Sequence, residues 1–334
     1  MKKIQVLDCT LRDGGYVNDW QFGKDAISGV KNALASAGVE IAELGFFRDE
    51  QYFENRAIFD SAERLGEVIG QKDPKMLYTG LIEMANYFPP EKLSPCDKNG
   101  PEAIRYSFWK RLIGDAYDYC AGIKEKGYKL CCQPTRVEQY SDEDFAEMCR
   151  NFSKLRPYAL YIVDTFGLLR KDDLLRYAKI GHENLDEGII LGYHAHDNMG
   201  QAFHNACSFL ELPFDRTLQV DASIGGIGRG AGNLRLEAIL EYLNVCHGKQ
   251  YDLSPIYEAW DKHIAPIKQN FKWGFEPHYF IAASKSCNPN YASFYLEKGL
   301  TALQCEQVLG TIEGPDKYLY SDEKALKYLK EGLK

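Results

Sequence analysis

The chain has 334 residues, of which 45% are hydrophobic and 26% are charged. These proportions are typical of a globular protein, and they exclude a disordered chain, a fibrous repeat and a disulfide-stapled miniprotein. No apolar run approaches the roughly 18 residues that a membrane-spanning helix needs. Forty Lys and Arg against 48 Asp and Glu give a net charge of −8, which disfavours binding to nucleic acid or to an anionic membrane surface.

Ten cysteines are spread along the chain without any C-x-x-C pair, so a cysteine zinc site has no support. Several of them, such as Cys131 and Cys149, lie in apolar runs typical of strands or helices. We therefore interpret them as reduced thiols that mostly fill the core, and we expect a cytoplasmic protein. The N-terminal segment has two lysines and a short apolar stretch broken by Gln5, which predicts a first strand and not a signal peptide.

Short apolar runs alternate with amphipathic segments from the N-terminus to about residue 248, which predicts alternating strands and helices. Eight strands in this alternation favour a (β/α)₈ TIM barrel. The doubly wound sheet is the alternative, but its dinucleotide-binding form needs a G-x-G-x-x-G turn after the first strand, where this chain has TLRDGG. The predicted strands are 4–8, 40–46, 75–82, 103–108, 128–133, 159–164, 189–196 and 218–223, and the predicted helices are 24–36, 53–69, 110–126, 141–155, 171–180, 199–210 and 233–246.

Two segments depart from this alternation. From residue 251 only helical patterns remain, so we assign 1–250 to a catalytic barrel and 251–334 to an appended C-terminal helical region. That region would cover one end of the barrel or contact another subunit. The segment 83–101 contains four prolines and follows the third predicted strand, so it forms either a lid over the barrel mouth or a variable surface loop.

His194 and His196 end the seventh predicted strand, with one residue between them. Because side chains alternate between the faces of a strand, both imidazoles can point into the barrel mouth. Asp13 follows the first strand, which lies close to the seventh in a closed ring of eight, and Arg12 would hold a fixed positive charge beside it. Two imidazoles and one carboxylate can hold a divalent metal with open positions for substrate and water. The plain alternatives are histidines hydrogen-bonded at a strand end, an Asp that caps a turn and an Arg on the surface.

A glycine-rich loop, SIGGIGRGAGN, follows the eighth predicted strand and ends at Asn233. Its glycines let the backbone approach a ligand closely, and the N–H groups before a helix often hold an anion. The loop lacks the lysine of a P-loop, so a nucleotide phosphate is a weak inference. Asn233 would either cap the next helix or offer its carbonyl oxygen to a metal. Thr165, after the sixth strand, would either contact a substrate carboxylate or start a helix.

Four motifs, in this order, resemble the metal-dependent aldolase and lyase superfamily of TIM barrels, the DRE-TIM metallolyases. They are TLRDG at 10–14, VDTFG at 163–167, HAHDN at 194–198 and GRGAGN at 228–233. That superfamily includes 4-hydroxy-2-oxovalerate aldolase, 3-hydroxy-3-methylglutaryl-CoA lyase, and the isopropylmalate and homocitrate synthases. The chain is most similar to the 4-hydroxy-2-oxovalerate aldolase branch, because the glycine-rich loop lacks the cysteine expected of the acyl-CoA lyases.

The resemblance implies a site and a cofactor. By it, Asp13, His194 and His196 bind Mn²⁺, with Mg²⁺ or Co²⁺ as alternatives, and Arg12 faces the substrate enolate. Asn233 is a further metal ligand in some branches only. The sequence Asn288-Pro289-Asn290-Tyr291 resembles the C-terminal helical region of the aldolase, in which a tyrosine reaches the active site.

One position departs from the aldolase pattern. The aldolase has a histidine base shortly after the LRDG segment, and Tyr16 stands at the matching position here. Tyrosine has an ordinary pKa of about 10, so it is a poor base at neutral pH unless a cation lowers its pKa. Tyr16 or Tyr291 could take the substrate proton or pass it through water, and a metal-bound water could replace them.

We expect an aldolase that cleaves or forms a carbon–carbon bond beside a 2-oxo acid and gives pyruvate and an aldehyde. The expected partners are the small-molecule substrate and either an acylating aldehyde dehydrogenase or further copies of this chain. One alternative is a Claisen-type synthase that uses acetyl-CoA. Another is a Schiff-base aldolase, which would need Lys129 or Lys75 to point into the barrel. The third is a non-catalytic barrel that has lost its histidine base.

Overall fold

The computed structural model describes residues 3–333 and contains a closed ring of eight parallel strands. Pairing between the first and second strands closes the ring, which confirms the predicted barrel. A two-residue strand, β3 (Ile58–Phe59), adds to β2 at its end. The strands of the ring are β1 (Ile4–Asp8), β2 (Ile41–Phe47), β4 (Leu77–Glu83), β5 (Ala103–Phe108), β6 (Lys129–Pro134), β7 (Ala159–Asp164), β8 (Ile190–Ala195) and β9 (Leu218–Ala222).

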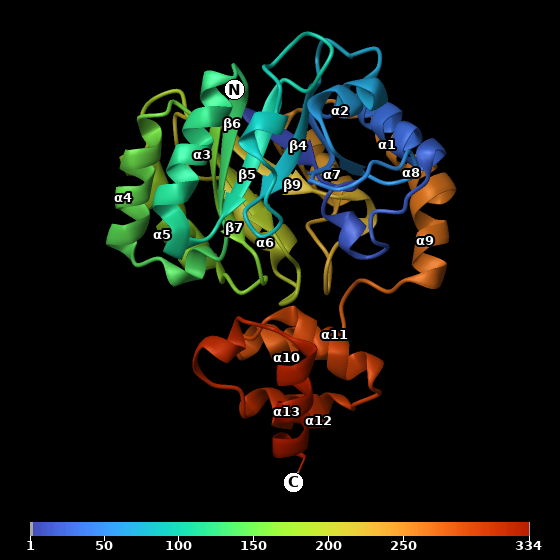
Figure 1. Cartoon of the computed structure of the whole chain (residues 1–334), viewed down its shortest axis with the longest axis vertical. Helices are drawn as coiled ribbons and strands as arrows, with labels where there is room; N and C mark the ends of the chain where they lie inside the picture. Colours follow the sequence, from blue (N-terminus) through green and yellow to red (C-terminus); the bar gives the residue numbers. More distant parts are fainter. Residues whose placement is uncertain (1–2, 334) are drawn as a thin grey trace.

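Helices surround this ring and cover the outer faces of its strands (Figure 1). The apolar core fills the layer between them, as expected for strands that are buried on both faces. These helices are α1 (Lys24–Ala37), α2 (Ala62–Ile69), α3 (Ile113–Glu125), α4 (Asp142–Ser153), α5 (Lys171–Asn184), α6 (Ala202–Leu210) and α7 (Leu236–His247).

Four predicted helices begin at least three residues later than the sequence pattern indicated, and those predicted from 110 and 199 begin at Ile113 and Ala202. The helix predicted from residue 53 begins only at Ala62, because the stretch before it contains β3 and because Ser61 caps the first turn. The helix predicted from residue 233 begins at Leu236, with Arg235 as its first flanking residue. By contrast, the predicted helix start at Ser141 is present as a reciprocal capping box with Asp144.

The C-terminal helices form two groups. Helices α8 (Ser254–Ala259) and α9 (Ala265–Asn270) pack on the outside of the barrel beside α1, and they share its apolar core. The remaining four helices have an apolar core of their own and lie below the barrel in Figure 1. We call them the cap domain: α10 (Pro277–Ser284), α11 (Pro289–Glu297), α12 (Ala302–Gly310) and α13 (Asp322–Gly332). The apolar cores therefore separate near residue 274, later than the assigned boundary at 250.

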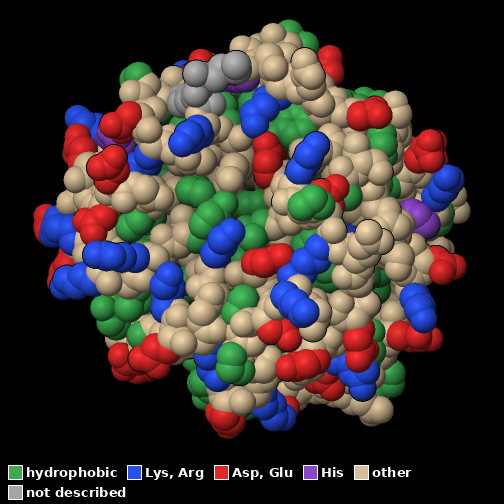
Figure 2. Space-filling model, turned by 90° about the horizontal axis from the view of Figure 1, so that it is seen from above, with side chains coloured by type: hydrophobic (Ala, Val, Ile, Leu, Met, Phe, Trp, Pro, Cys, Tyr) green, Lys and Arg blue, Asp and Glu red, His purple; other side chains and the backbone are tan. Residues whose placement is uncertain are grey.

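The surface of the described residues carries mixed charges at the end of the barrel away from the cap domain. Figure 2 shows Lys and Arg side chains interspersed there with Asp and Glu, without a large area of one sign. No helix within residues 3–333 is long and apolar enough to cross a bilayer. The ten cysteines are free, and Cys246 is the exposed one among them.

Candidate metal centre

Asp13, His194 and His196 meet at the end of the barrel that faces the cap domain. One potential ligand atom of each lies within 4.8 Å of the others, and all three side chains are buried. Asp13 lies in the turn after β1, His194 lies in β8, and His196 follows that strand directly. The two imidazole rings are nearly perpendicular, with centroids 5.1 Å apart. The structure thus brings together the three residues that the sequence pattern selected.

The charge states of these groups suit a divalent cation. Burial on its own would raise the pKa of Asp13, but the neighbouring Arg12 guanidinium and the two imidazoles hold it well below its usual range. Burial lowers the pKa of His196 to about 3, so its imidazole is neutral at physiological pH. An ionised carboxylate and a neutral imidazole are the forms that bind metal ions.

Asn233 lies against the same carboxylate. Its Nδ2 donates to Asp13 Oδ2 at 2.7 Å and to the carbonyl oxygen of Ile227 at 2.9 Å. Its Oδ1 is buried without a hydrogen-bond partner, which is a costly state for an amide oxygen. Asn233 therefore does not cap α7, and its unpaired oxygen fits the role of a further metal ligand. The four side chains together form an oxygen and nitrogen donor set that suits Mn²⁺, Mg²⁺ or Co²⁺.

A chain of buried charges inside the barrel supports the ligands. His194 Nδ1 lies 3.0 Å from Oδ2 of Asp221, and Asp221 forms an ion pair with Arg105. Arg105 is fully buried, and its Nη1 lies 2.7 Å from Oε2 of Glu43. A carboxylate that accepts from Nδ1–H leaves Nε2 of the imidazole free for a metal.

The other end of this chain of charges reaches Asp13. Arg12 donates from Nε to Oε2 of Glu43 at 2.7 Å and from Nη1 to Asp13. Arg12 is therefore buried and held by two carboxylates, and it is not the surface residue of the plain alternative. The sequence analysis missed Glu43, Arg105 and Asp221. A charged residue inside an otherwise apolar strand was the available signal in each case.

A cavity of about 700 Å³ opens above these residues, between the barrel and the cap domain. Arg12, Asp13 and both histidines form its floor, and loops after β4 to β7 form its walls. Residues of the cap domain complete the lining, namely Asn288, Asn290, Pro315, Tyr318, Leu319 and Tyr320. The helical region thus covers the mouth of the barrel.

Comparison with known proteins agrees with this architecture. A family model described as HMGL-like matches residues 109–261. The chain is 26% identical to a 4-hydroxy-2-oxovalerate aldolase of Thermomicrobium roseum, over 79% of this chain and 73% of that protein. It is 24% identical to an oxaloacetate decarboxylase of Mycobacterium tuberculosis, over 76% and 74% of the two chains. Over the matched segment the chain is similar to the HMGL-like family.

Solved structures show the same fold as this chain. The N-terminal domain of an aldolase candidate from Bacteroides vulgatus superimposes with a TM-score of 0.74 at 21% identity, covering 87% of this chain and 96% of that one. The HMG-CoA lyase of Brucella melitensis gives a TM-score of 0.60 at 18% identity, covering 81% and 99%. At these identities the likeness concerns the fold.

Tyr16 lines the cavity, but it is poorly suited to act as a base by itself. Its hydroxyl lies 3.3 Å from Oε2 of Glu83, at the end of β4. Desolvation raises the pKa of Tyr16, and the negative charge of Glu83 raises it further, so the phenol stays protonated. Arg229, whose guanidinium lies 5.3 Å from the ring centre, does not reverse this shift.

The structure does not bring Tyr291 to the cavity. Its ring is fully buried in the apolar core of the cap domain, and its hydroxyl donates to the carbonyl oxygen of Asp316 at 2.9 Å. The tail resemblance placed a tyrosine in the active site, whereas the neighbouring Asn288 and Asn290 line the cavity instead. The reason is that one face of α11 must fill the core of the cap domain, and Tyr291 lies on that face.

Thr165 lies on the cavity wall with its hydroxyl already in use. Its Oγ1 accepts a hydrogen bond from the backbone N–H of Arg136 at 2.8 Å, and its carbonyl oxygen lies 3.5 Å from Nη2 of Arg229. The hydroxyl still has a proton to donate to a ligand. Arg136 and Arg229 also line the cavity, and the sequence analysis assigned a role to neither.

The lysines of the Schiff-base alternative lie elsewhere. Lys129 is exposed at the start of β6, where its Nζ lies 5.3 Å from the ring centre of Tyr158. Lys75 is exposed before β4. Both are at the end of the strands opposite the cavity. Lys110 does line the cavity, but its Nζ is held by Asp144 at 2.6 Å.

The segment 83–101 lies partly at the mouth of the barrel and partly on its outer layer. Residues 83–86 line the cavity, so its first part does lie at the mouth. The later part packs against α3, where the hydroxyl of Tyr119 donates to the carbonyl oxygen of Phe88 at 2.6 Å. Phe88 and Leu93 are buried, so this part is anchored to the outer layer of the barrel.

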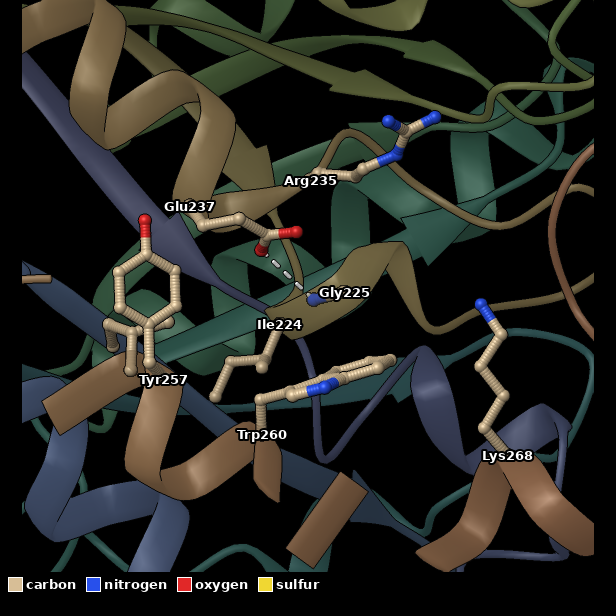
Figure 3. Close-up of a pocket in the computed structure, with 8 residues that line it drawn as sticks. Ile224, Gly225, Arg235, Glu237, Tyr257, Trp260 and Lys268 are labelled. Atoms are coloured by element: carbon tan, nitrogen blue, oxygen red, sulfur yellow. Dashed lines mark hydrogen bonds between the residues drawn. The ribbon is translucent and has the colours of Figure 1, made fainter. Parts of the chain in front are cut away.

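The glycine-rich loop is held by contacts within the protein. Figure 3 shows a second, smaller pocket behind it, where the N–H of Gly225 donates to Oε2 of Glu237 at 3.0 Å. Gly225 has a φ of +60°, and a Cβ on it would lie 2.0 Å from Trp260. On the other side of the loop, the N–H of Ala231 donates to Asn198. The glycines are therefore needed for the tight turns of this loop, which places Asn233 beside Asp13.

Proposed function

We propose that this chain is a divalent-metal-dependent lyase that cleaves, or forms, a carbon–carbon bond beside a 2-oxo acid. In the cleavage direction its products would be pyruvate and an aldehyde. The observation that carries this proposal is the buried cluster of Asp13, His194 and His196 on the floor of the cavity between the barrel and the cap domain, with the Arg12 guanidinium fixed beside it. The named relatives support the reaction class, although they are distant.

Asp13, His194, His196 and the unpaired oxygen of Asn233 would hold the metal ion, with Mn²⁺ as our first candidate and Mg²⁺ or Co²⁺ as alternatives. When bound, such an ion supplies Lewis-acid stabilisation of the negative charge that develops on the 2-oxo oxygen. The chain adds a second positive charge at Arg12. Because two carboxylates hold Arg12 in place, its charge needs no rearrangement during the reaction.

Cleavage also requires that the substrate hydroxyl lose its proton. We propose that Tyr16 takes this proton while passing its own to Glu83, whose Oε2 lies 3.3 Å away. As the carbon–carbon bond breaks, its electron pair goes to the enolate and the hydroxyl carbon becomes the aldehyde carbonyl. Arg48 holds the other oxygen of Glu83 at 3.0 Å, which fixes the carboxylate in position. This relay would replace the histidine base that the chain lacks.

Decarboxylation is the second candidate. The cavity offers no histidine outside the metal centre among its lining residues, and the loss of CO₂ from a 2-oxo diacid needs no base on a hydroxyl. One relative is named oxaloacetate decarboxylase. Both reactions would pass through the enolate of pyruvate, so they would share Arg12 and the residues that would hold the metal.

Metal analysis combined with a substrate screen tests the proposal. The purified protein would be stripped with a chelator and reloaded with Mn²⁺, Mg²⁺ or Co²⁺. Release of pyruvate from a panel of 4-hydroxy-2-oxo acids and from oxaloacetate would then be followed with lactate dehydrogenase. We expect release that depends on the metal and that Asp13→Asn abolishes. Tight metal binding without turnover of any panel member would instead favour the non-catalytic barrel, and condensation with acetyl-CoA would favour the synthase.

The proposal also includes a cellular compartment and protein partners. The free cysteines support a reducing compartment such as the cytoplasm. An acylating aldehyde dehydrogenase that consumes the aldehyde, or further copies of this chain, remain our proposed protein partners. The mass of the protein in solution, measured alone and with such a dehydrogenase, would distinguish them.

A further inference from the structure

The wall of the cavity opposite Asp13 carries positive charge that the proposed chemistry does not use. In the ring of strands, β6 lies four places from β1, so the loop after β6 is across the barrel mouth from the Asp13 turn. Arg136 lies in that loop, and Arg111 lies after the adjacent strand β5. Both line the same cavity as the metal ligands.

The backbone and the aromatic neighbours of Arg136 fix its position. Its φ of +58° is unfavourable for a residue with a side chain, and the hydrogen bond from its N–H to Thr165 holds it there. The guanidinium carbon lies 4.2 Å from the ring centre of Tyr318, in the cap domain, and 5.4 Å from that of Phe166. The charged group is therefore positioned where the barrel meets the cap domain.

The donors of Arg136 are largely unsatisfied. Nε and Nη2 are buried and have no hydrogen-bond partner. The nearest carboxylate is Glu138, whose Oε1 forms an ion pair with Nε at 3.7 Å, which is longer than a hydrogen bond. Burial raises the pKa of Glu138, which weakens it further as a counter-ion. An arginine whose N–H groups are buried without partners is costly unless a ligand pairs with them.

Among the other cations of the cavity, Arg229 also has a buried Nε without a hydrogen-bond partner, and its Nη2 lies 3.5 Å from the carbonyl oxygen of Thr165. The remaining cations are paired or exposed. Arg48 is paired with Glu83, Lys110 with Asp144, and Arg12 with two carboxylates. Arg111 is exposed, and its guanidinium carbon lies 4.7 Å from the ring centre of Trp109. Burial lowers the pKa of Arg136 more than the negative charge of Glu138 raises it, and the charge of Arg111 lowers it slightly further.

We propose that Arg136, assisted by Arg111, binds a second anionic group at the end of the substrate remote from the metal. The inference rests on the proposed function, since the 2-oxo acid end is taken to lie at the metal centre. The substrate class is then a 2-oxo acid that carries a carboxylate or a phosphate at its other end, and its far end lies between the barrel and Tyr318. A planar guanidinium that lines the cavity and has no hydrogen-bonded carboxylate suits either group.

Binding of matched ligand pairs tests the proposal. The probes are 2-oxoglutarate, 2-oxoadipate and 2-oxopimelate, each compared by calorimetry with its ω-monoamide on the Mn²⁺-loaded protein. The two members of a pair have the same shape and differ by one charge. Charge-assisted hydrogen bonds contribute about 1.5–3 kcal/mol, so we expect at least one diacid to bind about 10- to 100-fold more tightly than its amide. The ω-phosphono analogues of the same lengths show which of the two anions is preferred.

Variants of Arg136 and Arg111 test which side chain is responsible for tighter binding of the diacid than of its amide. Arg136→Gln should bring diacid and amide to equal affinity, while Arg136→Lys should retain part of the preference. Arg111→Gln should reduce it less than Arg136→Gln does. Arg150→Gln is the matched control, because Arg150 is exposed on α4 and pairs with Asn184 and Glu143 outside the cavity. It should behave as the wild type.

The outcomes separate this proposal from the proposed function. Metal-dependent pyruvate release without any diacid preference, or a preference that survives Arg136→Gln, would overturn the second anionic subsite alone. A diacid preference that Arg136→Gln removes, in a protein that releases no pyruvate from any substrate, would overturn the proposed reaction and leave the subsite standing.

Discussion

Asp221 connects the metal centre to the buried charges of the barrel, and replacing it by Asn tests whether that connection positions the site. Its Oδ2 lies 3.0 Å from His194 Nδ1 and also pairs with Arg105. Asn has nearly the same volume but no charge. The change leaves Arg105, which is fully buried, with Glu43 as its remaining ion-pair partner, and Glu43 already pairs with Arg12.

The magnitude follows from these contacts. Removing one partner of a buried ion pair typically costs about 3–5 kcal/mol of stability. Mutating the carboxylate that pairs with a metal-binding histidine typically weakens metal affinity by about 10- to 100-fold. We therefore expect Asp221→Asn to fold, to lose about 3–5 kcal/mol of unfolding free energy in urea, and to bind Mn²⁺ about 10- to 100-fold more weakly by calorimetry.

A second variant separates the two effects. In Asp221→Asn with Arg105→Met, the unpaired cation is also gone, so most of the lost stability should return. The metal affinity should stay low, because His194 still lacks its carboxylate. If Asp221→Asn matched the wild type in both measurements, the chain of buried charges would have no role in positioning the ligands. If the double variant also recovered metal affinity, the effect on the metal would be a consequence of lost stability only.

Three further predictions address the site, the loop and the pH dependence. Arg12→Ala should lower kcat by about 10²–10³-fold in a protein whose circular dichroism is unchanged, and near-normal turnover would reject its electrostatic role. Gly225→Ala should destabilise the protein by about 2 kcal/mol or more, because the new methyl group meets Trp260 and the backbone has a positive φ, and an unchanged urea midpoint would contradict this. Burial raises the pKa of Asp164 to about 7, so the folded state holds a proton that the unfolded state releases near pH 4. This group therefore makes the protein less stable as pH rises from about 4 to 7, by at most about 1.4 kcal/mol per pH unit, and Asp164→Asn should flatten that part of the stability profile.

The sequence predicted the barrel and the metal ligands because both depend on local patterns. Short apolar runs bounded by polar segments predict buried parallel strands, and all eight of these strands are present. Because side chains alternate between the two faces of a strand, His194 and His196, which are two residues apart, point their imidazoles to the same face. Closure of a ring of eight then brings the turn after β1 near β8, so Asp13 could be placed with them before any coordinates were known.

Local patterns were misleading where distant contacts compete with them. Residues 53–61 fit a helical pattern, yet part of that stretch pairs with β2 as a strand. Asn233 has the side chain of a helix cap, yet the loop turns it toward Asp13. Tyr291 matched a position in a related family, but the cap domain uses its ring to fill an apolar core.

The residue types along the chain were thus sufficient to predict the strands, their parallel arrangement and the end of the barrel at which the ligands lie. Only the tertiary structure decided that Glu43, Arg105 and Asp221 connect those ligands, and that Arg136 faces the same cavity with unpaired donors. The physical reason is distance along the chain. Backbone periodicity is set by neighbouring residues, whereas an ion pair between residues 105 and 221 exists only once the ring has closed and the interior has lost its water.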